Sequence, residues 1–235
     1  MSISYTSADS IAVVTLDDGK VNAMAMPFFE GLNAALDRAE REAAGAVVIA
    51  GREGMFSAGL NLKLLPTLPP EELTRTMIAF GRTMLRVFTF PIPTVAAISG
   101  HAVAGGAMLA FGCDLRIAAD GLFKLHLNEV AIGLPLPTWA ITLAHSAIPR
   151  RWHTEALLHA RAYSPAEALE RGIVDAVVSP MEVVAAASRA AEPLVALDKQ
   201  AYAASKRRHR AMAVEWANAR LETEMGQVPR RGAVG

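Results

Sequence analysis

Apolar residues in the first half of the chain are concentrated in short runs, which longer segments of mixed apolar and polar residues separate. Four runs are rich in small and β-branched residues: IAVVTL at 11–16, AVVIA at 46–50, TVAAIS at 94–99 and DLRIAA at 114–119. Runs of this length and composition are typical of strands that are covered on both faces of a sheet. We therefore predict that these four runs form strands of one sheet.

Two of the separating segments, residues 27–44 and 71–90, carry apolar side chains at the spacing of one helix face. In the second segment, Met77, Phe80 and Met84 lie on this stripe. Strands that alternate with helices in this way indicate an α/β fold with largely parallel strand pairing.

Helical patterns dominate the last third of the chain, apart from a strand-like run, IVDAVV, at 173–178. SPAE at 164–167 predicts a capping box with proline at the first helical position, and Gly172 predicts the end of that short helix. The alanine-rich stretch from 181 to 225 predicts two helices that are broken near Pro193.

We expect two parts along the chain. Residues 1–180 would form the body that carries the chemistry, and residues 181–235 a helical region that packs on this body or on a neighbouring copy. At 235 residues the chain is long enough to bury a substantial core.

Composition narrows the classes of partner and the compartment. Lysine plus arginine and aspartate plus glutamate each count 23, so net charge gives no general attraction to nucleic acid or to an anionic membrane. Cys113 is the only cysteine, which excludes an intrachain disulfide and a cysteine-based zinc cluster. The first residues lack a signal-peptide pattern and no long apolar run is present, so we expect a cytoplasmic protein without a membrane partner.

Several common catalytic signatures are missing: the phosphate-binding P-loop, a G-x-G-x-x-G after a strand, H-E-x-x-H and G-x-S-x-G. Two glycine-containing turns remain, FSAGLNLK at 56–63 and HAVAGGAM at 101–108. Such turns leave backbone N–H groups unpaired, and two of them side by side would form an oxyanion hole. Two ordinary strand-to-helix turns are the alternative explanation.

The chain resembles the crotonase superfamily, the enoyl-CoA hydratase/isomerase family, through motifs that occur in order between about residues 11 and 206. These motifs are KVNAM (20–24), FSAGLNLK (56–63), PIPTVAAISGHAVAGG (91–106), CDLRIA (113–118), NEVAIGLP (128–135) and SPAEALERGIVDAVV (164–178). The resemblance implies a ββα-spiral core, a helical C-terminal region used for oligomerisation, and homotrimers or dimers of trimers. It also implies an acyl-CoA thioester substrate.

The resemblance assigns roles to particular positions. It implies that the N–H groups of Leu60 and Gly105 form the oxyanion hole and that Glu129 is the catalytic glutamate. The further contacts with the acyl-CoA that we expect are with Ser57 and Ala58 near the adenine, with Asn61, Leu62 and Met108, and with Lys20, Lys63 and Lys206 at the phosphates. For each lysine, an ordinary surface position is the alternative.

Met108 occupies the position at which hydratases of this family carry a second glutamate. Methionine cannot exchange a proton, whereas a single carboxylate is sufficient to move a proton from C2 of a 3-enoyl-CoA to C4. The sequence GLPLPTWAITL after Glu129 is also similar to the mitochondrial-type 3,2-enoyl-CoA isomerases. We therefore predict an enoyl-CoA isomerase that needs no metal or redox cofactor, and we expect the apolar Met108 to help raise the pKa of Glu129.

Two alternatives stay open. The first is an enoyl-CoA hydratase of the same family, in which His101 or His126 could replace the missing acid. The second is a protein that binds acyl-CoA, or RNA through KRRHR at 206–210, without catalysis. A solvent-exposed helix face or a subunit contact explains this basic motif as well, and we expect no nucleic-acid partner.

Overall fold

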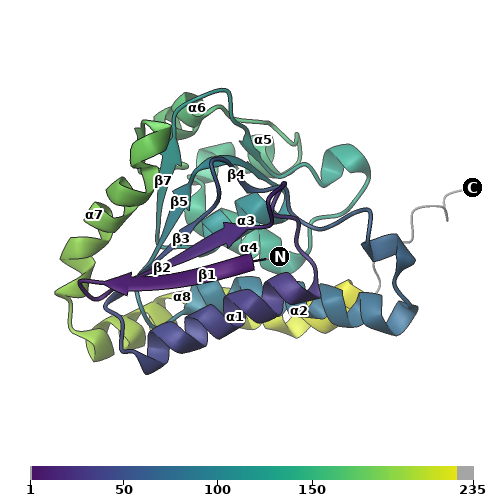
Figure 1. Cartoon of the computed structure of the whole chain (residues 1–235). Coiled ribbons are helices and arrows are strands. Elements are labelled where there is room, and N and C mark those ends of the chain that lie inside the picture. Colours follow the sequence, from purple (N-terminus) through teal and green to yellow (C-terminus); the bar gives the residue numbers. More distant parts are fainter. Residues whose placement is uncertain (1, 227–235) are drawn as a thin grey trace, which may run out of the picture.

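Six strands form the main sheet of the computed structural model, which describes residues 2–226. In spatial order these strands are β1 (Ser2–Ala8), β2 (Ile11–Asp17), β3 (Ala46–Ala50), β5 (Thr94–Ile98), β7 (Leu115–Ala119) and β9 (Ala176–Val178). β1 is antiparallel to β2, and all the other neighbours are parallel (Figure 1). The four strands predicted from the apolar runs are confirmed.

Three shorter strands form a second parallel sheet in the order β4 (Gly54–Ser57), β6 (Gly100–Val103) and β8 (Leu125–His126). Each follows directly after a strand of the main sheet, so the chain repeats a strand, a second strand and a helical segment. This repeat confirms the α/β fold with a ββα core that the sequence predicts. The apolar-run pattern does not predict β4 and β6, because their residues include the glycine turns.

Eight α-helices complete the fold of the described residues. They are α1 (Met26–Arg41), α2 (Pro70–Thr89), α3 (Gly105–Gly112), α4 (Thr138–Ala147), α5 (His153–Leu157), α6 (Pro165–Glu170), α7 (Val183–Val195) and α8 (Lys199–Gly226). Four short 3-10 helices lie at Leu65–Thr67, Val130–Ile132, Arg150–Trp152 and Pro180–Glu182. The capping box of α6 is present as predicted, because Ser164 and Glu167 each accept the other's backbone N–H.

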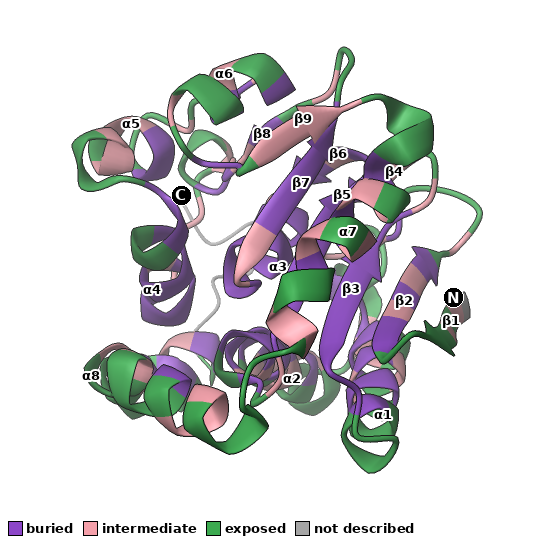
Figure 2. Ribbon diagram, turned by 90° about the vertical axis from the view of Figure 1, so that its left-hand side faces the viewer, coloured by how far each residue is buried: buried purple, intermediate pink, exposed green. Residues whose placement is uncertain are grey.

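Apolar residues on the two faces of the main sheet bury against different helices. In β3, Val48 faces α7, whereas Val47 and Ile49 belong to the larger core on the other face. Figure 2 shows α7 lying across the sheet, with α1 and α2 on the opposite side. Burial on both faces explains why these strands lack the alternation of apolar and polar residues that a half-exposed strand would have.

The two helices predicted for the alanine-rich stretch are present, and the break between them lies a few residues after Pro193. α7 continues through Pro193 to Val195, and α8 starts at Lys199. The carboxylate of Asp198 accepts the N–H of Ala201, which caps the start of α8 and fixes the break there. Proline so close to the end of α7 removes one backbone donor and leaves the rest of the helix intact.

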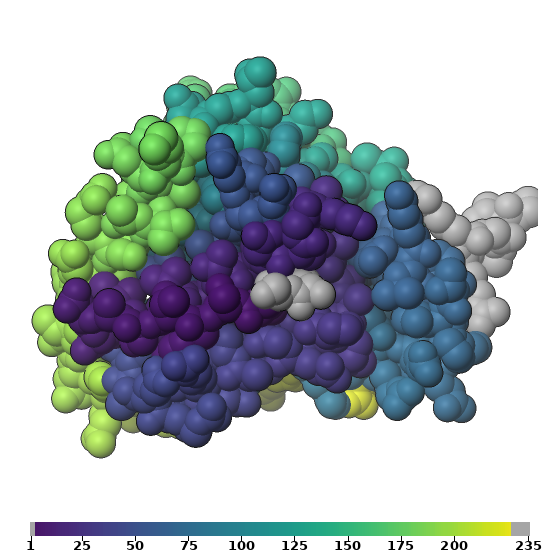
Figure 3. Space-filling model, viewed as in Figure 1, coloured from purple at the N-terminus to yellow at the C-terminus, as the bar shows by residue number. Residues whose placement is uncertain are grey.

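α8 packs beside α2 and α4, with Ala217, Leu221 and Met225 buried. On the face shown in Figure 3, strands β1 and β2 and helix α1 lie at the front, and α7 forms the left edge. Residues 227–235, the end of the predicted helical region, lie outside the described residues. Within residues 2–226, no helix is both long and apolar enough to cross a membrane.

Candidate active site

The structure brings the two glycine turns into direct contact. Gly59 has a φ of +80°, and a Cβ atom added to it would lie 2.7 Å from the nitrogen of Gly105. A Cβ atom on Gly106 would lie 2.1 Å from the carbonyl oxygen of Ser57. Contacts this short exclude any side chain, so glycine at these positions permits the two backbones to pack against each other.

Leu60 and Gly105 present their backbone N–H groups at this junction. Among the described residues, neither N–H donates to a protein acceptor. Gly105 is the first residue of α3, whose N-terminal N–H groups have no partner within the helix and carry the positive end of its dipole. Ala104, just before Gly105, has a φ of +52°, which is a strained conformation for alanine. This conformation sets the direction in which α3 leaves the turn. Two free donors on adjacent turns can share one oxygen atom.

Leu60 and Gly105 both line a pocket of about 320 Å³. Its wall is mainly apolar. The lining residues are Ala58, Leu60, Leu62, Met77, Phe80, Ala104, Gly105, Met108, Asn128, Glu129, Ile132, Leu134, Pro135, Leu136, Pro137, Trp139, Glu224 and Met225. The structure therefore gathers Ala58, Leu60, Leu62, Gly105, Met108 and Glu129 of the predicted site around one cavity.

Glu129 is the buried acid of this pocket. Only 8% of the residue is exposed, and its Oε2 atom has no hydrogen-bond partner among the described residues. Burial raises the pKa of its carboxyl to about 7, although the backbone N–H groups of Glu129 and Asn128 act in the opposite direction. A carboxylate with a pKa near neutrality and a free oxygen is suited to take up and release a proton.

A second carboxylate, Glu224 of α8, also lines the pocket, but it is hydrogen-bonded. Its oxygens accept the backbone N–H of Thr138 at 2.7 Å and the hydroxyl of Thr138 at 2.6 Å. These contacts cap the start of α4, which has no side-chain cap of its own. No sequence pattern predicts this residue, because its partner lies 86 positions away in the chain.

Other predicted contacts have local structural roles. The Ser57 hydroxyl donates to the carbonyl of Asn22 at 2.7 Å and accepts the N–H of Gly59 at 3.1 Å, which holds the first glycine turn. The side chain of Asn61 accepts backbone N–H groups of the next turn. Lys20 and Lys63 are exposed to solvent and do not line the pocket.

Neither candidate histidine lines the pocket within residues 2–226. The ring of His101 accepts the N–H of Lys124 at 3.1 Å and packs edge-on against Phe123. His126 contributes its carbonyl, which accepts the N–H of Ala104 at 2.9 Å. His126 thus supports the strained residue at the start of α3 through its backbone.

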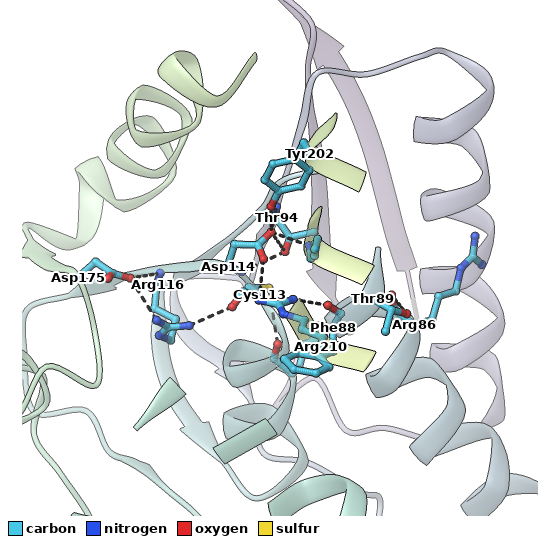
Figure 4. Close-up of polar contacts among 12 residues, drawn as sticks. Arg86, Phe88, Thr89, Thr94, Cys113, Asp114, Arg116, Asp175, Tyr202 and Arg210 are labelled. Atoms are coloured by element: carbon cyan, nitrogen blue, oxygen red, sulfur yellow. Dashed lines mark hydrogen bonds and ion pairs between the residues drawn. The ribbon is translucent and has the colours of Figure 1, made fainter. Parts of the chain in front are cut away.

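The prediction that Lys206 binds a phosphate is corrected by the structure. Lys206 is only 7% exposed, and its ammonium group lies 2.7 Å from the carboxylate of Asp114. A buried cation needs such a partner, so Lys206 is not available to a ligand. Asp114 also accepts hydrogen bonds from Thr94, Tyr202 and Arg210 (Figure 4).

This network also changes the interpretation of the basic motif at 206–210. Its first and last residues, Lys206 and Arg210, both point inward to Asp114. Burial alone would raise the pKa of the Asp114 carboxyl, but the two cations outweigh this effect and hold it below its usual value. The exposed part of the motif is therefore only Arg207, Arg208 and His209.

Comparison with known proteins gives one consistent family. The sequence model of the enoyl-CoA hydratase/isomerase family matches residues 6–228. Human mitochondrial enoyl-CoA delta isomerase 1 is 31% identical over 194 residues, which are 81% of this chain and 64% of the human protein. A putative enoyl-CoA hydratase of Thermus thermophilus is 36% identical over 187 residues, 77% of this chain and 73% of that protein.

Among solved structures, an enoyl-CoA isomerase of Mycobacterium tuberculosis without ligand matches with a TM-score of 0.89 and 35% identity. The match covers 96% of this chain and 98% of that one. The chain spans less than two thirds of the length of the human relative. The names of these relatives include both isomerase and hydratase, so what they share is the family.

Proposed function

Since the chain belongs to the enoyl-CoA hydratase/isomerase family, we propose that it shifts the double bond of a 3-enoyl-CoA to the 2 position. The observation that carries the proposal is that Glu129 is the one carboxylate with a free oxygen among the described residues of the pocket. Glu224 is bonded to Thr138, and Met108 is apolar. One available carboxylate matches a reaction that moves a single proton.

The reaction begins at the two backbone donors. The N–H groups of Leu60 and Gly105 bind the thioester oxygen of the substrate, which makes the C2 protons more acidic. Negative charge then develops on that oxygen as the enolate forms. Donors fixed in an apolar pocket stabilise this charge without reorganising, and losing one such donor typically costs about 10²- to 10³-fold in rate.

Glu129 carries the proton between two carbon atoms. Its carboxylate removes a proton from C2, the electron pair moves toward the oxygen, and the conjugated dienolate forms. The protonated Glu129 then returns the proton to C4, which leaves the double bond between C2 and C3. Atoms and charge balance within the substrate and one side chain, so the proposed reaction requires no metal ion and no redox cofactor.

The apolar wall supports this role of Glu129 through its pKa. A carboxylate with a pKa of about 7 is a stronger base than one at the ordinary value of 4.5, and it is still half ionised near neutral pH. Met108 contributes to the wall at this point instead of providing a second acid. This arrangement favours proton transfer within the substrate over activation of water.

Hydration is the second candidate function, and one observation favours it. Asn128 lines the pocket next to Glu129, and its Oδ1 atom has no hydrogen-bond partner among the described residues. This oxygen could accept a hydrogen bond from a water molecule that Glu129 activates. The Thermus thermophilus relative, a putative hydratase, is consistent with this candidate.

The remaining features are also proposals. We expect a role in fatty acid metabolism, a cytoplasmic location, and assembly as a homotrimer or a dimer of trimers. The exposed lysines Lys20 and Lys63 remain candidates for contacts with the phosphates of coenzyme A, because an ammonium group on a flexible side chain can reach a phosphate in solvent.

A direct assay tests the function. The purified protein is incubated with trans-3-hexenoyl-CoA, and the 2-enoyl product is followed by its ultraviolet absorbance. We expect turnover in the wild type and in the Glu222→Gln variant, whose exposed carboxylate does not line the pocket. Glu129→Gln is expected to lose about 10²- to 10⁴-fold in rate. Equal rates for wild type and Glu129→Gln would refute the proposed mechanism.

A further inference from the structure

We infer that the end of α8 closes the acyl pocket and sets the maximum acyl chain length, with Trp139 and Met225 as the stop and Glu224 as the residue that holds α8 against α4. The inference rests on the proposed function, because it assumes that the pocket binds the acyl part of a thioester. It assigns a specificity role to three residues that have no part in proton transfer.

A chain of contacts orders the pocket wall away from the oxyanion donors. A Cβ atom on Gly105 would lie 3.0 Å from the ring of Phe80. The Phe80 ring meets Trp139 edge-on, with 4.7 Å between the ring centroids. The indole N–H of Trp139 then donates to the sulfur of Met225 at 3.5 Å. An acyl chain that leaves the thioester site passes Phe80 and reaches Trp139 and Met225.

The stop is closely packed from behind. A Cβ atom added to Gly81 of α2 would lie 2.9 Å from the indole nitrogen of Trp139 and 3.0 Å from Cδ1 of Leu221. Trp139 is fully buried, and Met225 is 5% exposed. Three helices, α2, α4 and α8, therefore meet around these side chains at van der Waals contact. An acyl chain has no space to continue between them.

Glu224 links two of the three helices. It accepts both the N–H and the hydroxyl of Thr138, and thereby satisfies the first donors of α4 from a residue of α8. A carboxylate at the start of a helix also interacts favourably with the helix dipole. Leu136 and Pro137, just before α4, line the same pocket. Loss of Glu224 would free the end of α8 to move away from the pocket.

This geometry predicts how affinity depends on chain length. Each methylene group that enters an apolar pocket improves affinity by about fourfold. The gain should continue until the chain reaches Trp139 and Met225 and then stop or reverse, because further carbons force the packed helices apart. The chain length at this break is the quantity that the wall residues control.

The test measures the binding of saturated acyl-CoAs of increasing even chain length by calorimetry. Saturated chains cannot be isomerised, so the result does not depend on turnover. Met225→Ala shortens the side chain that closes the wall and is expected to move the break to longer acyl chains. Met212→Ala is the matched control, since Met212 is on the same helix but is 85% exposed. We expect no change of the break in this control.

Two further variants keep the test decisive if Met225→Ala folds poorly. Met225→Phe fills the end of the pocket and should move the break to shorter chains. Glu224→Ala should weaken the break and admit longer chains, whereas Glu222→Ala, which removes only an exposed ion pair with Arg82, should leave it in place.

The possible results separate the two proposals. A break that stays at the same chain length in Met225→Ala, Met225→Phe and Glu224→Ala would overturn the inference and leave the proposed function intact. Wild-type protein that binds no acyl-CoA of any length would overturn the proposed function, and the inference with it. Shifts in the expected directions, absent from both controls, support the inference.

Discussion

Replacing Glu129 with glutamine should reduce activity and increase stability, and the size of the second effect follows from the structure. Glutamine has nearly the same shape as glutamate but cannot ionise. In the wild type the buried carboxyl has its pKa raised from 4.5 to about 7. The folded protein therefore binds this proton more tightly than the unfolded chain does.

The direction of the pH effect follows from this difference. Glu129 does not oppose folding below about pH 4.5, where it is protonated in both states. As the pH rises toward 7, the unfolded chain releases the proton and the folded protein retains it, so stability is lost. A pKa difference of this size corresponds to about 3 kcal/mol of unfolding free energy.

The assay is urea unfolding of wild type and Glu129→Gln at several pH values. The variant should be more stable by less than about 1 kcal/mol at pH 5 and by about 3 kcal/mol at pH 8. The wild-type rate should rise about tenfold between pH 6 and pH 8, as the base becomes ionised. A stability difference that does not change with pH would show that Glu129 is not held in an unfavourable apolar site, and the reasoning would be refuted.

Three further predictions concern residues outside the proton transfer. Lys206→Met removes one of the two cations that neutralise the buried Asp114, and should lower the unfolding free energy by about 3 kcal/mol. Urea unfolding measures this loss, and KM for an acyl-CoA should not change. A changed KM with unchanged stability would instead indicate a ligand contact. Gly106→Ala places a Cβ atom against the carbonyl of Ser57 and should cost more than about 2 kcal/mol and most of the activity, whereas normal activity would contradict the packed glycine turns. Cys113 should not react with a thiol reagent until urea unfolds the protein, because burial raises its pKa to about 12; rapid reaction of the folded protein would contradict its burial.

The main sheet can be predicted from the sequence because its strands are buried on both faces. The runs at 46–50 and 94–99 coincide with β3 and β5 to within one residue. β1 lies at the edge of the sheet and consists largely of polar, exposed residues, so the hydrophobic pattern does not predict it. The hydrophobic pattern does not predict β4 and β6 either. Each begins with a glycine, and a glycine in a short segment indicates a turn more than a strand.

The candidate site is predictable only as far as backbone geometry and local motifs reach. Gly59 and Gly105 indicate sharp turns from the local sequence alone. The family resemblance identifies Glu129 as the catalytic glutamate. Lys206 shows where prediction from local sequence stops. Nothing in the basic motif indicates that Lys206 is buried and paired with an aspartate 92 positions away in the chain. The same holds for Glu224. Its partner, Thr138, is brought close to it only by the packing of α8 against α4.

The most direct test of the account is the ratio of two activities of the same purified protein, isomerisation of a 3-enoyl-CoA and hydration of crotonyl-CoA. Because Glu129 is the one carboxylate with a free oxygen among the described pocket residues, we predict fast isomerisation and hydration that is slower by at least about tenfold. Hydration as fast as isomerisation, lost in Asn128→Ala, would contradict the single-base account and make Asn128 the residue that holds the attacking water.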